Sequence, residues 1–421
     1  MKILYILMAL GFMVLWLIRF GIELCGGSLQ TRKEEKKRVT VKTMAIVFGL
    51  ALLFHALIIL CGGLIYCLHL AEDAASLEGL LSCWNRWDGP HYLEIAQYGY
   101  EHFVNEGRHL FLVFFPLYPW MVRVMHVLCR DWVVAGILVS TIAYAVGAAF
   151  FYATIAEEYD AETAEKSLIL LSVSPFAFQF GACMTEGLFF CLLAISFYLI
   201  KKHRWLLAGM VGILCALCRM QGVIILGVGM VEFLVSYPVI RYIREKKVGV
   251  FLKAFFTKAV FMFLPLIGTF VYLMINYSVD GDAFAFVRYQ REHWYLSPTF
   301  FTNCLSEITG YLVGSGYEPS VIVGSFLPEV IFFFVAFLAL YYGVWRHPLK
   351  YTAFLFVYVM VNYSVTWLVS GGRYMLCALP LYVIAGGFVK RHPKTYPWFV
   401  AISSFLMSIY ATGNILWKQV M

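Results

Sequence analysis

Residues 42–70 read KTMAIVFGLALLFHALIILCGGLIYCLHL, and Lys42 is the one residue among them with a formal charge, counting His as neutral. An apolar run of about 20 residues is long enough to cross the hydrocarbon core of a bilayer as a helix. A helix also satisfies all of its own backbone hydrogen bonds, which lipid cannot do. This stretch therefore predicts a membrane-spanning helix and an all-α integral membrane protein.

The rest of the 421-residue chain has the same character. Hydrophobic residues make up 62% of it and charged residues 14%, whereas a soluble domain carries about 25% charged residues. This composition excludes a soluble enzyme, a disordered chain and a nucleic-acid-binding domain. We predict a single transmembrane domain over residues 1–421, a polytopic helix bundle of about twelve spans, in which residues 1–30 form an extra N-terminal span. The runs lie near residues 3–22, 42–70, 132–153, 167–183, 185–200, 205–218, 222–236, 259–276, 327–343, 351–369, 374–389 and 396–416.

Basic residues predict the sidedness of the loops. Of the 32 Lys and Arg residues, 21 fall in one set of alternate loops and nine in the other set. Cytoplasmic loops carry the excess of Lys and Arg, so residues 71–131 and 277–326 are predicted to be the first and second outer loops. The basic set comprises residues 31–42, 154–166, 201–204, 237–258, 344–350 and 390–395.

The run at 110–129 is apolar enough to be a further span, but a crossing there would reverse the sidedness of residues 201–204. Pro116 and Pro119 break its start, and basic side chains follow on its later turns. We therefore predict interfacial helices in the first outer loop.

The eleven cysteines show no spacing typical of a disulfide framework. Cys215 and Cys218 form a C-x-x-C pattern inside the apolar run ILCALCRM, which indicates helix packing rather than a redox or metal site. Three histidines of the first outer loop, His91, His102 and His109, have no recognisable metal-ligand spacing.

Asp88 is the first candidate for chemistry. It lies in WNRWDGPHYLEIAQYGY, residues 84–100, where Gly89-Pro90 predicts a turn before a short amphipathic helix. One interpretation is a helix-capping Asp in an interfacial aromatic belt. The other is a carboxylate base held at the water–lipid boundary, where it meets a lipid-linked substrate.

Glu186 is the second candidate, a lone carboxylate between two apolar runs in SPFAFQFGACMTEGLFFCL, residues 174–192. A carboxylate is costly inside hydrocarbon, so its retention suggests function. The alternative is a surface Glu that opens the next helix, favoured by the helix dipole and capped by Thr185. Residue type alone leaves both interpretations open.

Three outer arginines are candidates for binding phosphate, because the guanidinium fork matches phosphate oxygens. Arg219 lies in CRMQGV, Arg373 in SGGRYML and Arg288 in FVRYQREHW. The alternative for Arg219 and Arg373 is snorkelling from a helix end to the interface. Arg288 has the alternative of an interfacial anchor.

Taken together, these motifs resemble the PIG-V mannosyltransferases, which belong to the GT-C class of membrane glycosyltransferases. The most specific matches are WDGPHYLEIAQYGY at 87–100 and FFPLYP at 114–119. The segments at 174–192, 205–223, 281–294 and 373–383 follow in the order of the family, and the likeness covers about residues 41–389. One departure is Arg-Met-Gln-Gly at 219–222, where the family often has Arg-Ser-Asn-Gly, which bears on the acceptor.

The resemblance implies a GT-C-like fold and an inverting transfer of mannose from a polyprenyl-phosphate donor, on the outer face of a membrane. It implies Asp88 as the catalytic base and Glu186 as a second catalytic carboxylate. The short chain favours a bacterial plasma-membrane enzyme whose active site faces outward. The residues that the resemblance implies for substrate binding are Trp87, His91, Tyr92, Arg219, Gln221, Arg288, Gln290, Arg373 and Tyr374.

The partners implied are the lipid-linked sugar donor, membrane lipids and a glycan, glycolipid or protein acceptor, without nucleic acid. A divalent metal at Glu186 is left open, and no other cofactor is implied. Two alternatives remain: a GT-C enzyme that uses a different lipid-phosphate sugar, and a non-catalytic flippase or transporter of lipid-linked sugars. A transporter would carry ionisable groups along a path at the midplane, and such groups are almost absent from the predicted span centres.

Overall fold

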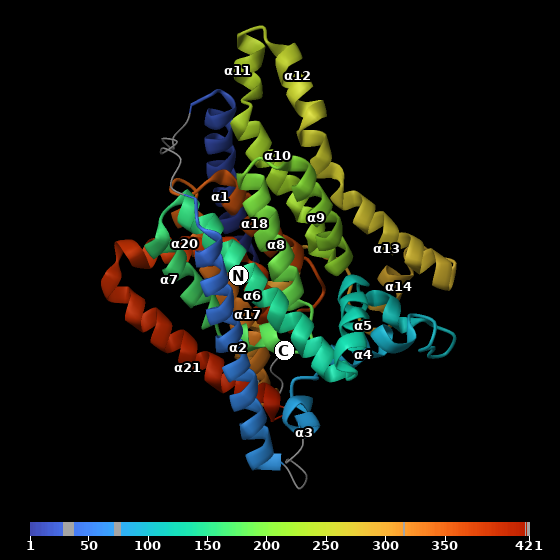
Figure 1. Ribbon diagram of the computed structural model, residues 1–421. Coiled ribbons are helices and arrows are strands. Elements are labelled where there is room, and N and C mark those ends of the chain that lie inside the picture. The colour runs from blue at the N-terminus through green and yellow to red at the C-terminus, as the bar shows by residue number, and fades with distance from the viewer. Residues whose placement is uncertain (28–37, 71–76, 315, 417, 419–421) are drawn as a thin grey trace.

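The protein is a bundle of helices (Figure 1). The structure is a computed structural model, and it describes residues 1–27, 38–70, 77–314, 316–416 and 418. Its described residues form no strand, and two isolated β-bridges join Asn105 to Arg108 and Pro298 to Val365. The predicted all-α class is confirmed. The predicted basic loop at 31–42 and the start of the first outer loop lie partly outside the described residues.

Six helical segments in the described part of the chain are long and apolar enough to cross a membrane. The most buried of them is the central helix α6, which packs against α2 and α8. Asp131 caps the start of α6, since its Oδ1 accepts a hydrogen bond from the Val134 N–H at 2.7 Å. The long helices are α1 (Lys2–Leu24), α2 (Val41–Leu70), α6 (Trp132–Glu158), α13 (Pro265–Asp280) with its preceding turn Ala259–Phe263, α17 (Leu327–Gly343) with the preceding Pro319–Phe326, and α21 (Tyr396–Ile415).

The predicted count of twelve spans is not reached, because several apolar runs form short or broken helices. A seventh span is counted only if Gly371–Cys377 and Leu379–Arg391 are taken together, and these two pieces meet at an angle of 74°. Breaks at membrane depth are tolerated where protein buries the freed backbone groups. The shorter bundle helices are α7 (Ala161–Ser172), α8 (Glu186–Lys201), α9 (Trp205–Cys218), α10 (Ile224–Ser236), α18 (Leu349–Tyr363), α19 (Gly371–Tyr374) and α20 (Leu379–Arg391).

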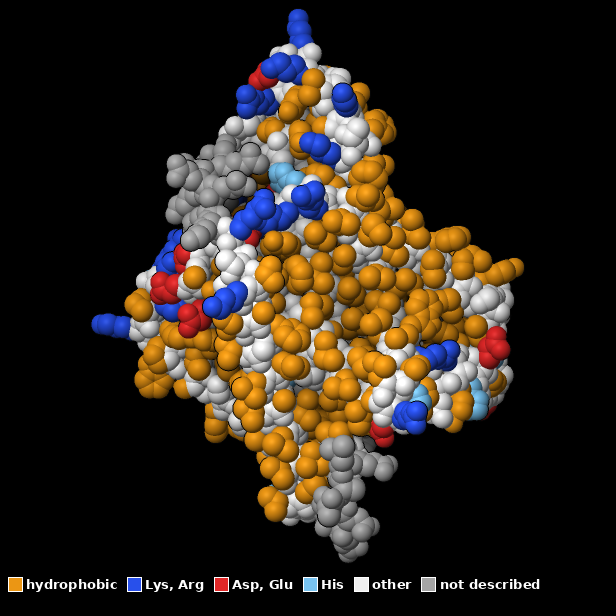
Figure 2. All heavy atoms as spheres, viewed as in Figure 1, with side chains coloured by type: hydrophobic (Ala, Val, Ile, Leu, Met, Phe, Trp, Pro, Cys, Tyr) orange, Lys and Arg blue, Asp and Glu red, His pale blue; other side chains and the backbone are white. Residues whose placement is uncertain are grey.

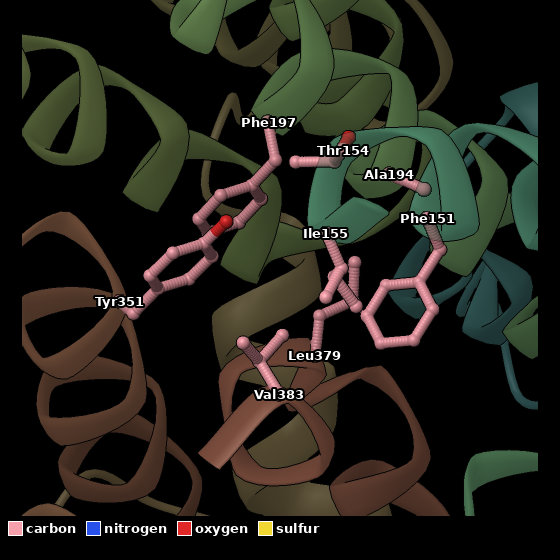
Figure 3. Close-up of a pocket in the computed structure, with 8 residues that line it drawn as sticks. All are labelled: Phe151, Thr154, Ile155, Ala194, Phe197, Tyr351, Leu379 and Val383. Carbon is pink, nitrogen blue, oxygen red and sulfur yellow. The ribbon is translucent and has the colours of Figure 1, made fainter. Parts of the chain in front are cut away.

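The interior of the bundle is closely packed where α6, α8, α18 and α20 meet (Figure 3). A cavity of about 10 Å³ lies there, and its walls are almost entirely apolar. The rings of Phe197 and Tyr351 stack beside it with centroids 5.5 Å apart. A space of this size holds one water molecule at most, so it is not a substrate site.

Basic residues gather at one end of the bundle, here called the basic end (Figure 2). The helices α11 (Val239–Arg244) and α12 (Val248–Thr257) project from this end (Figure 1). Lys201 and Lys202 bind Glu157 at 2.8 and 2.6 Å. Lys390 binds Asp160 at 2.5 Å. These ion pairs join loops that the charge pattern assigned to one side.

The opposite end, here called the site end, carries the predicted outer loops. Residues of the first loop and of α14 share a small apolar core, which places the two loops against each other. Arg123 of α5 fastens this lobe, because its Nε donates to the Ala96 carbonyl at 2.6 Å. The helix α5 has 13 residues and is not one of the candidate spans. The site-end helices are α3 (Leu77–Ser82), α4 (Gly89–Tyr98), α5 (Leu117–Cys129), α14 (Ala285–His293), α15 (Phe301–Val313) and α16 (Pro319–Val321).

All eleven cysteines are free, and Cys215 and Cys218 are buried in the apolar interior.

Candidate functional site

Asp88 is brought to the bundle by a close contact between the first outer loop and the segment before α8. The Cys183 N–H donates to the Trp84 carbonyl at 3.0 Å. Gly89 makes the approach possible, because a Cβ there would lie 2.6 Å from the Asn85 Oδ1 and 3.3 Å from the Cys183 carbonyl oxygen. Asp88 therefore starts α4 directly beside the chain that leads to Glu186.

The Asp88 side chain does not cap α4, although it occupies the N-cap position. Its Oδ2 instead accepts a hydrogen bond from Arg373 Nη2 at 3.0 Å. The carboxylate is 34% exposed, so it is paired on one side and open to an incoming hydroxyl on the other. The helix-capping interpretation of Asp88 is therefore wrong.

Glu186 begins α8 and its side chain is 1% exposed, which overturns its interpretation as a surface residue. Its Oε1 accepts a hydrogen bond from Arg219 Nη1 at 2.9 Å. The same oxygen lies 3.2 Å from Arg373 Nε, without the alignment of a hydrogen bond. Glu186 Oε2 is buried and has no hydrogen-bond partner among the described residues. An unsatisfied buried oxygen of this kind is costly unless a ligand completes it.

Arg373 is buried and Arg219 is largely enclosed, with side chains 6% and 12% exposed, so neither snorkels to the interface. Both guanidinium groups lie over the ring of Tyr374, at 4.7 Å and 5.4 Å from its centroid. Arg219 lies in the break that follows α9, and Arg373 lies in α19, before the break that precedes α20. The snorkelling interpretation is therefore wrong for both.

Asp88, Glu186, Arg219 and Arg373 form one cluster, called here the charge cluster. Its two carboxylates and two guanidinium groups balance in formal charge. Buried charges need such partners, because desolvation penalises an isolated ion. Arg373 connects the two carboxylates, and among the described residues its Nη1 has only the Met184 sulfur as acceptor, at 3.5 Å. A thioether is a weak acceptor, so this nitrogen remains available to an anionic ligand.

Two further predicted residues lie behind or beside the charge cluster. Burial, and then the neighbouring Asp88 carboxylate, raise the pKa of the Tyr92 phenol well above its ordinary value. Gln221 donates to Asn362 at 2.9 Å. Asn362 Nδ2 in turn donates to the Tyr358 carbonyl at 2.8 Å, and the Tyr358 hydroxyl donates to the Tyr374 carbonyl at 2.9 Å. This series of contacts links Gln221 to the segment whose ring underlies the arginines.

The other predicted binding residues are occupied elsewhere. Trp87 Nε1 donates to Asn414 Oδ1 at 2.9 Å. His91 packs against the rings of Phe111 and Phe114. Arg288 pairs with Asp280 at 2.5 Å, outside the charge cluster. The structure does not join these residues to the cluster.

Gln290, the remaining predicted binding residue, contributes its backbone: its carbonyl accepts a hydrogen bond from the Leu296 N–H at 2.9 Å. This bond closes the turn after α14, away from the charge cluster.

The charge cluster does not fit a divalent metal. Arg373 occupies the space between Asp88 and Glu186, so guanidinium groups already supply the positive charge there. Nowhere in the described part of the chain do three or more His, Cys, Asp or Glu side chains converge as metal ligands.

Glu329 is a residue that the sequence reasoning missed. It is 1% exposed near the start of α17, and its Oε1 accepts a hydrogen bond from the Gly371 N–H at 2.5 Å. A Cβ at position 371 would lie 1.7 Å from Glu329 Oε2, so only glycine permits this approach. The signal was present, because Glu329 is a lone carboxylate at the start of an apolar run, as Glu186 is.

We expect Glu329 to act as a positioning residue for Arg373, which follows the glycines it holds. Glu329→Ala should lower kcat by about tenfold or more, since small displacements at a reacting centre are costly. Glu329→Gln keeps a carbonyl acceptor for the Gly371 N–H and should stay within about threefold of wild type. Steady-state kinetics of both variants test this. If Gln is as damaging as Ala, the role of Glu329 is charge rather than positioning.

A family match covers the part of the chain that contains two residues of the charge cluster. Residues 115–274 match the family described as dolichyl-phosphate-mannose-protein mannosyltransferase. The match is therefore to a family of glycosyltransferases. It is less than half of the chain, and it contains Glu186 and Arg219 but neither Asp88 nor Arg373. PIG-V membership in particular is not shown.

Among solved structures, the crystal structure of ArnT from Cupriavidus metallidurans bound to undecaprenyl phosphate is similar to the chain, with 17% sequence identity and a TM-score of 0.47. The similarity covers 82% of this chain and 60% of that one, so the chain spans about 60% of the length of that protein. No curated protein matches the sequence.

Proposed function

We propose that the protein is an inverting membrane glycosyltransferase of the GT-C class, which moves a sugar from a polyprenyl-phosphate donor to an acceptor hydroxyl at the charge cluster. The observation that carries this proposal is the pairing of a half-exposed carboxylate, Asp88, with an arginine that also faces the buried Glu186. The glycosyltransferase class of residues 115–274 supports it.

Asp88 is the general base of the proposed reaction. Its carboxylate takes the proton of the acceptor hydroxyl as the oxygen attacks the anomeric carbon of the donor sugar. The bond from that carbon to the phosphate oxygen breaks on the opposite face, so the anomeric configuration inverts. Arg373 keeps the Asp88 carboxylate oriented by donating a hydrogen bond to its Oδ2.

The leaving group is a polyprenyl phosphate, which departs as a stable anion without a general acid. Arg373, through its Nη1, and Arg219 stabilise the charge that develops on it. Glu186 holds both guanidinium groups in place. Its unpaired Oε2 is a second acceptor for a substrate hydroxyl.

Mannose is the proposed sugar, on the resemblance of the motifs to the PIG-V family and on the family match at 115–274. The proposed acceptor reacts at the outer face of a bacterial plasma membrane. Completing the predicted twelve crossings would require the short helices to serve as tilted or paired spans.

The test of the function is incubation of the purified protein with polyprenyl-phosphate mannose, glucose, galactose and arabinose. Release of polyprenyl phosphate is followed for each donor, and the anomeric configuration of the product is read by NMR. We expect one donor to be consumed with inversion. Movement of these lipids across proteoliposomes without consumption of any donor would support the transporter instead.

The orientation of the protein in the membrane is a separate prediction, because it depends on the excess of Lys and Arg in one set of loops. Cys25, Cys61, Cys67 and Cys129 are replaced first, since the other seven cysteines are buried and protected. In that background Glu101→Cys at the site end should react with an impermeant maleimide from outside. Lys246→Cys at the basic end should react only after the membrane is opened. The reverse pattern would place the charge cluster on the cytoplasmic side.

A further inference from the structure

A second cavity lies at the site end, apart from the charge cluster. Its volume is about 470 Å³, within the range of about 300–1,000 Å³ that is usual for small-molecule sites. It is bounded by the second outer loop, by α15 and by the segment 366–369, and it is lined by Tyr295, Glu307, Ile308, Tyr311, Tyr317, Phe326, Thr366, Trp367, Leu368 and Val369.

The walls of this cavity combine aromatic rings with a few polar groups. Tyr311, Tyr317 and Phe326 contact one another with centroids 5.0 to 5.1 Å apart. The Glu307 carboxylate, also in the lining, accepts a hydrogen bond from the Tyr311 hydroxyl. Trp367 forms another wall, and its Nε1 donates to the Trp294 carbonyl at 2.9 Å.

This lining matches the chemistry of a sugar. The apolar C–H face of a pyranose packs on an aromatic ring, while its hydroxyls need acceptors and donors at the rim. Glu307 offers a carboxylate acceptor, and the exposed Tyr295 and Tyr317 hydroxyls offer both functions. The Thr366 and Tyr311 hydroxyls already donate to the Tyr295 carbonyl and to Glu307. A polyprenyl chain would gain nothing from a carboxylate in the wall, and its desolvation would oppose binding.

The cavity is connected to the charge cluster through two of its walls. The segment 366–369 continues into Gly371–Tyr374, so Val369 and Arg373 are at most ~14 Å apart along the chain. Phe326 lies three residues before Glu329, which holds Gly371. The cavity wall at Val369 and the charge cluster are therefore separated by no more than about the length of a short oligosaccharide.

The loop that carries Tyr295 is fastened to the same segment. The Thr366 N–H donates to the Ser297 carbonyl at 2.9 Å, and the Thr299 N–H donates to the Ser364 carbonyl at 3.0 Å. These bonds preorganise the cavity before a ligand arrives, which lowers the entropic cost of binding.

We infer that this cavity is an acceptor subsite that binds a carbohydrate, so the acceptor is a glycan or the glycan part of a glycolipid. The inference rests on the proposed glycosyltransferase function and names its acceptor class. Tyr317 and Glu307 are the specificity-determining residues, through ring stacking and hydroxyl recognition.

The experiment measures binding without turnover. The full-length protein in lipid nanodiscs is titrated with mannobiose, chitobiose and maltose, and saturation transfer to the sugar protons is recorded by NMR. Choline serves as a cation probe, because an aromatic site with a carboxylate could also hold an ammonium group. Tyr317→Ala, Glu307→Ala and the milder Glu307→Gln are compared with Tyr277→Ala, an exposed tyrosine outside the cavity.

We expect at least one disaccharide to bind, and we expect Tyr317→Ala and Glu307→Ala each to raise its Kd about tenfold. Tyr277→Ala should leave Kd unchanged, and Glu307→Gln should have an intermediate effect. Absence of sugar binding, equal effects at positions 277 and 317, or binding of choline alone would overturn the inference. Equal effects at positions 277 and 317 would indicate an interfacial aromatic belt. Binding of choline alone would indicate a cation site.

Asp88→Asn separates this inference from the proposed function. If that variant still binds the disaccharide and loses turnover, both stand. If it keeps full turnover while the cavity variants lose sugar binding, the base assignment fails and the subsite remains.

Discussion

Asp88→Asn should leave the protein folded and lower turnover by about 10²–10⁴-fold, the usual contribution of a general base. The amide cannot take a proton from the acceptor hydroxyl, but its oxygen can still accept the hydrogen bond from Arg373 Nη2. Removing one negative charge from a balanced cluster should favour the anionic donor. We therefore expect kcat to fall while the donor KM does not rise.

Asp131→Asn is the matched control. It is also an aspartate at a helix start of the site end, and asparagine caps a helix about as well as aspartate does. Kinetics, thermal stability and yield should be measured for both variants. Turnover of the Asp88 variant within threefold of wild type would refute its role as the base.

Arg373→Ala should lower kcat by about 10²–10³-fold and also raise the donor KM, because Arg373 serves the leaving phosphate and orients Asp88. The magnitude is that of losing one donor that stabilises an anion in a transition state. Arg373→Lys should recover activity only in part, since an ammonium group cannot reach Asp88 and Glu186 with separate nitrogens of a planar fork.

Stability must be measured alongside, because removing one partner of a buried ion pair costs about 3–5 kcal/mol. Arg346 is an exposed arginine at the basic end. Arg346→Ala therefore controls for the removal of an arginine that lies away from the charge cluster. Wild-type kinetics in the Lys variant, or an Ala variant that loses stability alone, would return Arg373 to a structural role.

Both predictions depend on the charge cluster as one unit, so their effects should not add. Asp88 and Arg373 are in direct contact, and residues in contact show coupling energies of about 0.5–3 kcal/mol. A double variant that is no worse than Arg373→Ala alone would indicate that Arg373 acts chiefly by holding Asp88.

The sequence by itself determined the class of the protein and most of the charge cluster. Long apolar runs can satisfy their backbone only as helices in lipid, so the all-α membrane class followed from composition. Glu186 was identifiable because a lone carboxylate is costly beside apolar runs, and Arg219 and Arg373 because they are single cations at the ends of such runs. Asp88 was identifiable by its place at a turn in an aromatic loop that resembles the family's first motif. Tyr374 was marked by its place next to Arg373.

Only the tertiary structure decided how these residues combine. Asp88 and Arg373 are 285 positions apart, and no local pattern predicts a contact of that range. The enclosure of Arg219 and Arg373 excluded their snorkelling interpretation. Arg288 is outside the cluster because it pairs locally with Asp280. The breaks that shorten several predicted spans also depend on tertiary packing, because neighbouring helices must bury the freed backbone groups. The sequence shows which charged residues would be costly to bury, but the partner that compensates each charge is seen only in the folded bundle.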